Sequence, residues 1–184
     1  KPMGSQMKSW TLAGFVGLAA CATPVGGEAV AEAQTPAVAP PMEFSLLHQL
    51  QADVSAERIE ADIRTLAGFG TRHTASETES DTRGIGAARR WIRAEFEAIS
   101  SECGGCLEIV EVSNVIFGQQ RVPDPVDVVS VLAIQRGTSD PDRMVMMSGD
   151  IDSRITNVMN STDDSPGAND NASGMAGAIE AARV

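Results

Sequence analysis

Three aspartates stand in two short segments whose composition and spacing could support chemistry. Asp150 and Asp152 are two residues apart, so in extended backbone both project to the same side. The apolar run at residues 144–147 directly precedes them and predicts a short buried β-strand. Ligands of open α/β sheets bind at the carboxyl ends of strands, and we therefore expect both aspartates at such an end.

Asp170 stands in the second segment, residues 165–174, which is rich in Gly, Asn, Asp and Ser. That composition is typical of a tight loop, and an Ala-rich helical pattern begins near Met175. Three carboxylates that converge at one place are costly unless a cation lies between them. The two segments together predict a metal site.

Both segments resemble the start of the catalytic domain of the M28 family of metallopeptidases. Residues 149–153 (Gly-Asp-Ile-Asp-Ser) match the family pattern G-H-x-D-S at every position but the second. Residues 167–174 (Gly-Ala-Asn-Asp-Asn-Ala-Ser-Gly) match the pattern G-A-x-D-[DN]-x-S-G throughout, and residues 181–184 continue the resemblance.

The resemblance implies a role for each aspartate. Asp170 corresponds to the metal-binding carboxylate that bridges two zinc ions (Zn²⁺), and Asp152 to the catalytic aspartate that orients the site. Asp150 stands where the family has a histidine ligand. If Asp150 is a metal ligand, its harder, anionic oxygen favours manganese, magnesium or calcium at that position over zinc.

The resemblance also implies the fold class, an α/β three-layer mixed-sheet sandwich of the zinc-peptidase type. Family members supply a Glu-Glu pair, another Asp and a distal His downstream of these motifs, and the printed sequence ends before those positions. We therefore expect residues 43–184 to be the amino-terminal portion of an M28-like peptidase domain, incomplete and inactive alone.

The expected function of the parent protein is that of a co-catalytic metal-dependent exopeptidase, an aminopeptidase, acting on peptide substrates. Two alternatives remain: a catalytically inactive M28-like lipoprotein with an interaction role, and a binding module stabilised by a hard cation. The formal net charge of −11 argues against a nucleic-acid partner. No protein partner can be inferred.

Residues 1–21 are interpreted as a lipoprotein-type signal peptide. A short apolar run ends in Leu-Ala-Ala-Cys at residues 18–21, which resembles a bacterial lipobox with Cys21 as the lipidated residue. The alternative is an ordinary signal peptide with an incidental Cys. Residues 1–6 are interpreted as a cloning remnant or a misplaced start, and residues 22–42 as an Ala/Pro-rich linker. The predicted location is the periplasm or, through a lipid anchor, the outer membrane of a Gram-negative bacterium.

Hydrophobic periodicity predicts the remaining elements. Three amphipathic helices are expected before residue 100, the second capped by Ser55 and the third by Thr82. Two strands are expected at residues 107–112 and 126–134, the latter buried on both faces.

Cys103 and Cys106 flank two glycines and are expected to form a structural disulfide in an oxidising compartment. The two histidines are not expected to be ligands. His48 falls on an amphipathic helix, and His73 on a loop, residues 70–74, which resembles the Thr-Arg loop of many M28 proteins.

Overall fold

The computed structural model describes residues 44–184. The predicted signal peptide, lipobox and linker lie outside these residues, and their interpretation stays a prediction. In the described part, helices, one π-type turn and two strands follow one another in this order: α1 (Ser45–Asp53), α2 (Ala56–Gly68), α3 (Gly84–Glu102), β1 (Leu107–Ile116), β2 (Val126–Gln135), η1 (Ala168–Ala172) and α4 (Ser173–Arg183).

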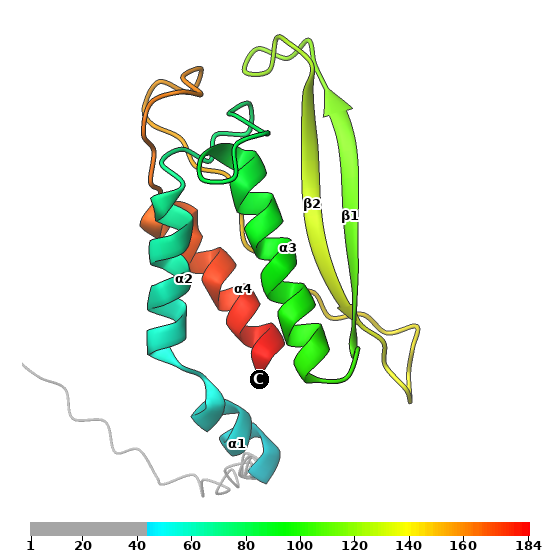
Figure 1. Ribbon diagram of the computed structural model, residues 1–184. Coiled ribbons are helices and arrows are strands. Elements are labelled where there is room, and N and C mark those ends of the chain that lie inside the picture. Colours follow the sequence, from blue (N-terminus) through cyan, green and yellow to red (C-terminus); the bar gives the residue numbers. More distant parts are fainter. Residues whose placement is uncertain (1–43) are drawn as a thin grey trace, which may run out of the picture. The chain divides into compact units, whose positions relative to one another are not determined.

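Helices α2, α3 and α4 lie side by side and enclose the core (Figure 1). The core is apolar because each helix turns one stripe of hydrophobic side chains inward. Its buried members are Leu66, Ala88, Ile92, Phe96, Ile99, Ala172, Met175 and Ile179. The apolar stripe of α3, between residues 85 and 99, thus packs into the core.

The start of α2 is as the sequence predicts, and the start of α3 is not. The Ser55 hydroxyl accepts a hydrogen bond from the backbone N–H of Arg58 at 3.1 Å. Helix α3 begins at Gly84, so the predicted Thr82 cap is wrong. The Ser76 hydroxyl, from the preceding loop, accepts the N–H of Ile85 at 2.9 Å instead.

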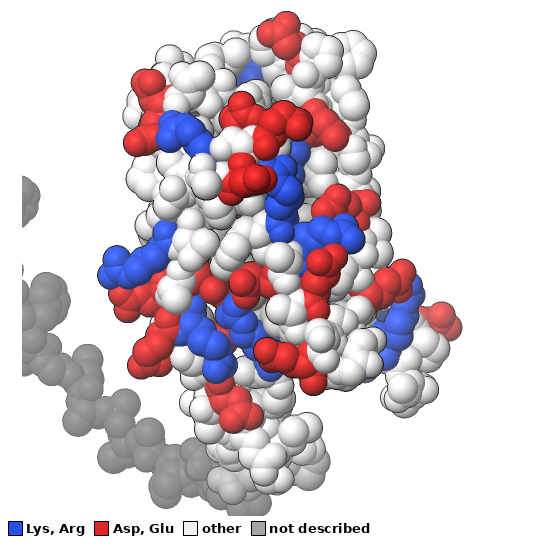
Figure 2. All heavy atoms as spheres, in the orientation of Figure 1, with Lys and Arg blue, Asp and Glu red and all other residues white. Residues whose placement is uncertain are grey.

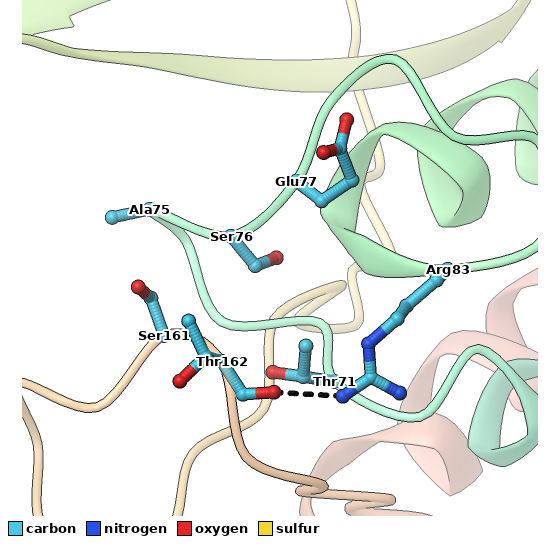
Figure 3. A pocket seen from close by; sticks show the side chains of 7 residues that line it. All are labelled: Thr71, Ala75, Ser76, Glu77, Arg83, Ser161 and Thr162. Atoms are coloured by element: carbon cyan, nitrogen blue, oxygen red, sulfur yellow. Dashed lines mark hydrogen bonds between the residues drawn. The ribbon is translucent and has the colours of Figure 1, made fainter.

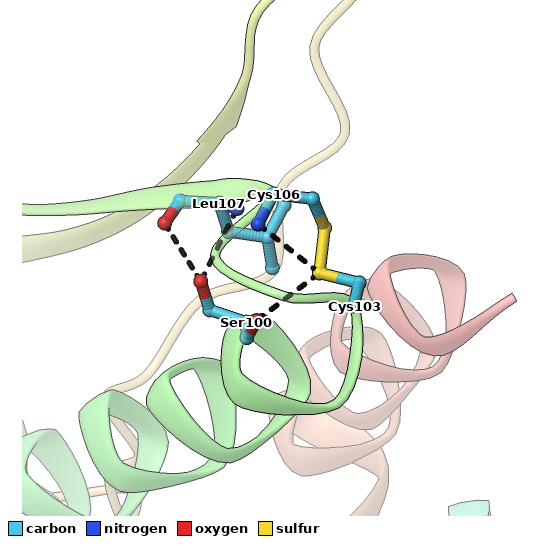
Figure 4. Close-up of a disulfide and its surroundings, with 4 residues drawn as sticks. All are labelled: Ser100, Cys103, Cys106 and Leu107. Atoms are coloured by element: carbon cyan, nitrogen blue, oxygen red, sulfur yellow. Dashed lines mark hydrogen bonds between the residues drawn. A yellow bond between two sulfur atoms is a disulfide. The ribbon is translucent and has the colours of Figure 1, made fainter.

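Strands β1 and β2 form an antiparallel hairpin with a register that runs from Leu107 opposite Gln135 to Ile116 opposite Val126. Helix α3 covers one face of this hairpin (Figure 1). The disulfide between Cys103 and Cys106 closes the turn from α3 into β1, with the two Cα atoms 5.6 Å apart (Figure 4). The expected cysteine pairing is thus present in the structure.

The Ser100 hydroxyl stabilises the same turn through two hydrogen bonds to the backbone of Leu107. It donates to the carbonyl oxygen of Leu107 at 2.9 Å and accepts the Leu107 N–H at 3.2 Å (Figure 4). The exit from α3 is therefore fixed by both a covalent bond and a hydroxyl bridge.

The strand predicted at residues 144–147 is not formed. These side chains are 86%, 91%, 75% and 60% exposed along an irregular segment. The segment borders a groove of about 730 Å³ that β2 and α4 also line. β2 is also only partly buried, contrary to the prediction of burial on both faces. Both predictions fail for one physical reason: in the part of the chain described, no third strand pairs with β2.

The structure is thus a mixed α/β arrangement with a small two-stranded sheet and helices on one face. Acidic side chains and arginines are interleaved over the surface shown in Figure 2. Within residues 44–184, no helix combines the length and apolarity that a membrane crossing requires.

Candidate metal centre

A short stretch of the loop after α2, residues 70–72, lies between the two aspartate-bearing segments and hydrogen-bonds to both. On one side, the N–H of Ser153 donates to the carbonyl oxygen of Arg72 at 3.2 Å. On the other side, the N–H of Ser165 donates to the carbonyl oxygen of Gly70 at 2.8 Å, and Thr71 pairs with Ser165 in a parallel bridge. The predicted proximity of the two segments is therefore supported by backbone hydrogen bonds.

Three hydroxyl groups fill the space between these backbones. The Thr71 hydroxyl lies 3.0 Å from the Ser165 hydroxyl, and the Ser153 hydroxyl lies 3.2 Å from the same oxygen. The Ser153 hydroxyl also accepts the N–H of Arg72 at 3.1 Å. All three side chains are buried, and each of these buried hydroxyls has a partner, as buried polar groups require.

Arg72 is the largest completely buried side chain of the described residues, with 0% exposure. Its guanidinium donates to four backbone carbonyl oxygens, at distances of 2.7 to 3.0 Å, and these belong to Leu66, Ile151, Pro166 and Gly167. Burial lowers the pKa of the Arg72 guanidinium, and the negative charge of Asp152 opposes that shift. Sequence reasoning noted the Thr-Arg loop but considered only His73 there, and so missed this residue.

The three predicted site aspartates are all exposed. Asp152 is oriented by the hydroxyl of Thr74, which donates to its Oδ2 at 3.0 Å. Asp150 and Asp152 also line the groove next to β2. Among residues 44–184, no three or more His, Cys, Asp or Glu side chains are grouped so that they could hold a metal ion. The roles of Asp150 and Asp170 as ligands stay predictions.

Asp170 lies at a kink in η1, with φ −122° and ψ 90°, and the peptide bond that follows it is cis. The next side chain, Asn171, has its Oδ1 buried without a hydrogen-bond partner. A Cβ on Gly174 would lie 1.9 Å from that oxygen, so only glycine allows Asn171 this position. A buried acceptor without a partner, beside an exposed carboxylate, is compatible with an oxygen-rich cation site.

Gly149 brings the first segment against the start of α4. A Cβ at this position would lie 2.4 Å from the backbone nitrogen of Met175, closer than real contacts permit. The glycine that opens the first motif is therefore needed for a close approach between the segment and the helix.

A separate polar pocket of about 360 Å³ lies between residues 71–83 and residues 161–162 (Figure 3). Arg83 points into it and donates to the carbonyl oxygen of Thr162 at 2.7 Å. Arg83 also forms an ion pair with Asp164 at 2.7 Å. None of the three site aspartates lines this pocket, so it is not part of the candidate metal centre.

The ring of His73 is engaged within the loops. Its Nε2 lies 3.0 Å from the carbonyl oxygen of Val158, and its Nδ1 accepts the N–H of Ala75 at 3.1 Å. Both ring nitrogens thus have backbone partners, which agrees with the reading of His73 as part of the loop architecture.

Comparison with known proteins supplies the family. The model of peptidase family M28 matches residues 130–184, which include both aspartate-bearing segments. This chain belongs to peptidase family M28. The resemblance found in the two motifs is therefore confirmed.

Several relatives of this M28 chain are fungal. A "Probable zinc metalloprotease" of Pyrenophora teres f. teres is 48% identical over 138 residues, covering 75% of this chain and 29% of the relative. One from Leptosphaeria maculans is 48% identical over 132 residues, covering 72% and 31%, respectively. A third, from Pyricularia oryzae, is 46% identical over 132 residues, covering 72% and 26%. The chain thus spans less than a third of the length of these relatives, and no solved structure matches it significantly.

The fungal relatives correct one prediction from the sequence. The location in the periplasm or at the outer membrane of a Gram-negative bacterium is wrong, because the M28 proteins most similar to this chain among those described come from fungi. The prediction of location rested on the short apolar run that ends at residues 18–21 and on the linker after it, whereas the relatives match over more than 130 residues.

Proposed function

We propose that this chain forms part of a zinc-dependent metallopeptidase that hydrolyses peptide bonds, with aminopeptidase action. The observation that carries the proposal is the joining of the two M28 motif segments by residues 70–72 through backbone hydrogen bonds. The relatives named zinc metalloproteases support zinc as the cofactor. Because the chain covers only part of those relatives, the activity belongs to the complete protein.

The donor chemistry of the site fits part of a divalent metal centre. Asp170 and Asp150 offer exposed carboxylates, which zinc accepts as ligands. In the proposed site the carboxylates of Asp170 and Asp150 would hold the metal, with Asp170 as the bridging ligand. Bound zinc would supply Lewis-acid activation of the peptide carbonyl and of water.

The other residues of this chain at the proposed site orient its metal ligands. Asp152 acts as the catalytic aspartate that orients the site, and the hydrogen bond from Thr74 fixes its carboxylate. Residues that orient metal ligands commonly change metal affinity or activity by about 10–100-fold when they are removed. The proton transfer to the leaving amine requires a further acid–base group, and we assign that role to none of the residues that the structure describes.

Asp150 supports a second candidate function, a binding module stabilised by a hard cation. All three site residues offer only oxygen ligands, which calcium and magnesium prefer. No three-ligand cluster forms within the described residues, and this observation also suits a weaker cation site. Substrate turnover by the complete protein distinguishes the two functions.

We further propose that the complete domain is a three-layer α/β sandwich. Helices α2, α3 and α4 would form one outer layer, and β2 would lie inside a larger mixed sheet. The support is the apolar groove beside β2 together with the exposed apolar side chains of residues 144–147. Exposed apolar surface of this extent is unusual on a soluble domain.

The test is to measure metal content and peptidase activity of the protein from the complete reading frame. After dialysis against zinc, elemental analysis should give two ions per chain, and Asp170→Ala should remove both together with hydrolysis of amino-acid anilides. Asp150→His should raise zinc affinity, since imidazole is the softer ligand. Asp124→Asn is the matched control, because Asp124 is an exposed carboxylate in the loop before β2.

Retention of full zinc content by Asp170→Ala would contradict the assignment of the bridging ligand. If Asp150→His changes neither the stoichiometry nor the preference among metals, Asp150 is not a ligand. If the complete protein binds calcium or magnesium and shows no hydrolysis, the binding module is the correct function.

A further inference from the structure

We propose that Arg72 is the positioning residue of the metal centre and that it fixes the spacing between the segment of Asp150 and Asp152 and the segment of Asp170. This inference rests on the proposed function and deepens it. It assigns the geometry of the site to a residue that is not itself a ligand and lies outside the two aspartate-bearing motifs.

Three of the four acceptors of Arg72 lie in the aspartate-bearing segments. Nε of Arg72 donates to the carbonyl oxygen of Ile151 at 2.8 Å, and Ile151 is the residue between the two aspartates of the first segment. Nη1 donates to Pro166 at 2.7 Å and Nη2 to Gly167 at 3.0 Å, just ahead of Asp170 in the second segment. One planar group therefore contacts both segments at once, within a few residues of each proposed ligand.

The guanidinium of Arg72 is also hydrogen-bonded to the helical core. Nη1 also donates to the carbonyl oxygen of Leu66 at 2.7 Å, in the last turn of α2. The final carbonyls of a helix lack intrahelical partners and attract a cation. Leu66 itself is fully buried in the core. Through Arg72, the two segments are thus held in position relative to α2 and not only relative to each other.

All four acceptors of the Arg72 guanidinium are backbone carbonyl oxygens. Backbone carbonyls belong to the main chain, so hydrogen bonds to them fix the path of the backbone whatever side chains it carries. Arginine presents its donors in a rigid planar fork, whereas the lysine ammonium is a single point on a flexible stem. Only arginine can donate hydrogen bonds to carbonyl oxygens on three separate stretches of chain. Water does not reach the guanidinium, because Arg72 has no exposed surface.

The fit around the guanidinium is close. A Cβ on Gly167 would lie 3.1 Å from Nη2 of Arg72 and 2.6 Å from Cβ of Ser153. Gly167 also has a left-handed backbone, with φ 47°, which favours glycine. The first glycine of the second motif is therefore explained by its contact with Arg72 and the neighbouring serine.

The experiment measures zinc affinity of the protein from the complete reading frame, by competition with a chromophoric chelator under conditions where each variant is folded by circular dichroism. Arg72→Lys and Arg72→Ala should each weaken zinc binding by about 10–100-fold. Guanidinium chloride at low, non-denaturing concentration should restore part of the affinity of Arg72→Ala. Sodium chloride at the same concentration should not.

Arg89→Ala is the matched control. Arg89 is a half-buried arginine on α3 that donates to the carbonyl oxygen of Asp127 at 3.0 Å. Arg89 also lines the groove beside β2, but its hydrogen-bond acceptor lies in neither aspartate-bearing segment. Its replacement should lower thermal stability but leave zinc affinity unchanged, and guanidinium should not alter its zinc binding.

Two results would overturn the inference while the proposed function stands: wild-type protein that binds zinc no more tightly than Arg72→Lys, or guanidinium that raises the melting temperature of Arg72→Ala without changing its zinc affinity. If the Arg72 variants do not fold, Ser165→Ala tests the same junction, because it removes the hydroxyl beside Thr71 and Ser153. We expect it to weaken zinc binding by about tenfold, and unchanged affinity would count against the inference. Wild-type protein without zinc binding would overturn the proposed function itself.

Discussion

A half-buried arginine and a fully buried one stabilise two regions of this molecule by different means. Arg183, on α4, pairs with the carboxylates of Asp62 and Glu95 at 2.7 Å each and of Glu180 at 3.3 Å. Arg72, at the junction of the aspartate-bearing segments, has backbone carbonyls as its hydrogen-bond acceptors. The first arrangement joins helices through side chains that can gain protons, and the second fixes backbone through groups that cannot.

The helix interface is therefore the pH-sensitive region. Hydrogen bonds from Arg58, opposed by burial and aided by the N–H of Ser55, lower the pKa of Glu180 from 4.5 to about 2. Burial by itself lowers the pKa of Arg183, but its hydrogen bonds with Asp62 and Glu95 raise it overall. Glu180 and Arg183 thus both stay charged in the folded protein at neutral pH.

The largest effect should come from Arg72→Met. Methionine fills part of the volume but donates nothing, so four carbonyls lose their donor in a site without water, at a cost of about 3–5 kcal/mol in the free energy of unfolding. Urea unfolding followed by the fluorescence of Trp91, which packs near Phe69, measures the loss. A cost below about 1 kcal/mol would show that the carbonyls find water instead.

A somewhat smaller effect, dependent on pH, should come from Glu180→Gln. Because folding lowers the pKa of Glu180, its contribution is complete above about pH 5 and is lost as the pH falls toward 2. The shift corresponds to about 3 kcal/mol. Urea unfolding between pH 7 and pH 2.5 should show a steep acid loss in wild type and a shallower one in the variant.

Arg72→Met is the reference for this series of unfolding measurements. Its loss of stability between pH 7 and pH 2.5 should equal that of wild type, since carbonyl oxygens do not titrate in this range. Parallel pH curves for Glu180→Gln and wild type would contradict the assignment of acid sensitivity to the helix interface.

The smallest effect should come from Ser55→Ala, which removes the cap of α2 but keeps the backbone N–H that Glu180 accepts at 2.6 Å. Loss of such a cap costs about 1 kcal/mol. The cost should be larger at pH 7 than at pH 3, measured by thermal unfolding, because the Ser55 hydroxyl also donates to Oε2 of Glu57 at 3.0 Å. A backbone hydrogen bond and this one lower the pKa of that carboxyl. Equal costs at both pH values would show that the hydrogen bond to Glu57 does not contribute to stability.

Local features of this fold could be predicted from the sequence because they depend on neighbours along the chain. Helical periodicity placed α2 and α3, the Ser55 hydroxyl placed the start of α2, and two glycines between Cys103 and Cys106 indicated the disulfide. The run at residues 144–147 was predicted as a strand because it is apolar, but a strand also requires a pairing partner, and none of the described residues provides one.

The residues of the candidate site also differ in whether the sequence alone could reveal them. Asp150, Asp152 and Asp170 could be found because they lie in contiguous motifs. Arg72 could not, since its partners Ile151 and Gly167 are 79 and 95 residues away in sequence, and no periodicity connects them. The contact of Ser76 with the start of α3 could not be predicted for a similar reason: the loop that carries Ser76 folds back onto α3 only in three dimensions.

The sequence separation of the Arg72 contacts has a consequence for the order of folding. The hairpin of β1 and β2 closes between adjacent elements, whereas the junction of Arg72 with Ser153 and Pro166 closes loops of 81 and 94 residues. Long loops cost more entropy to close and tend to form late. We expect Arg72→Lys to have a φ-value near zero, so that stopped-flow experiments show faster unfolding and nearly unchanged refolding.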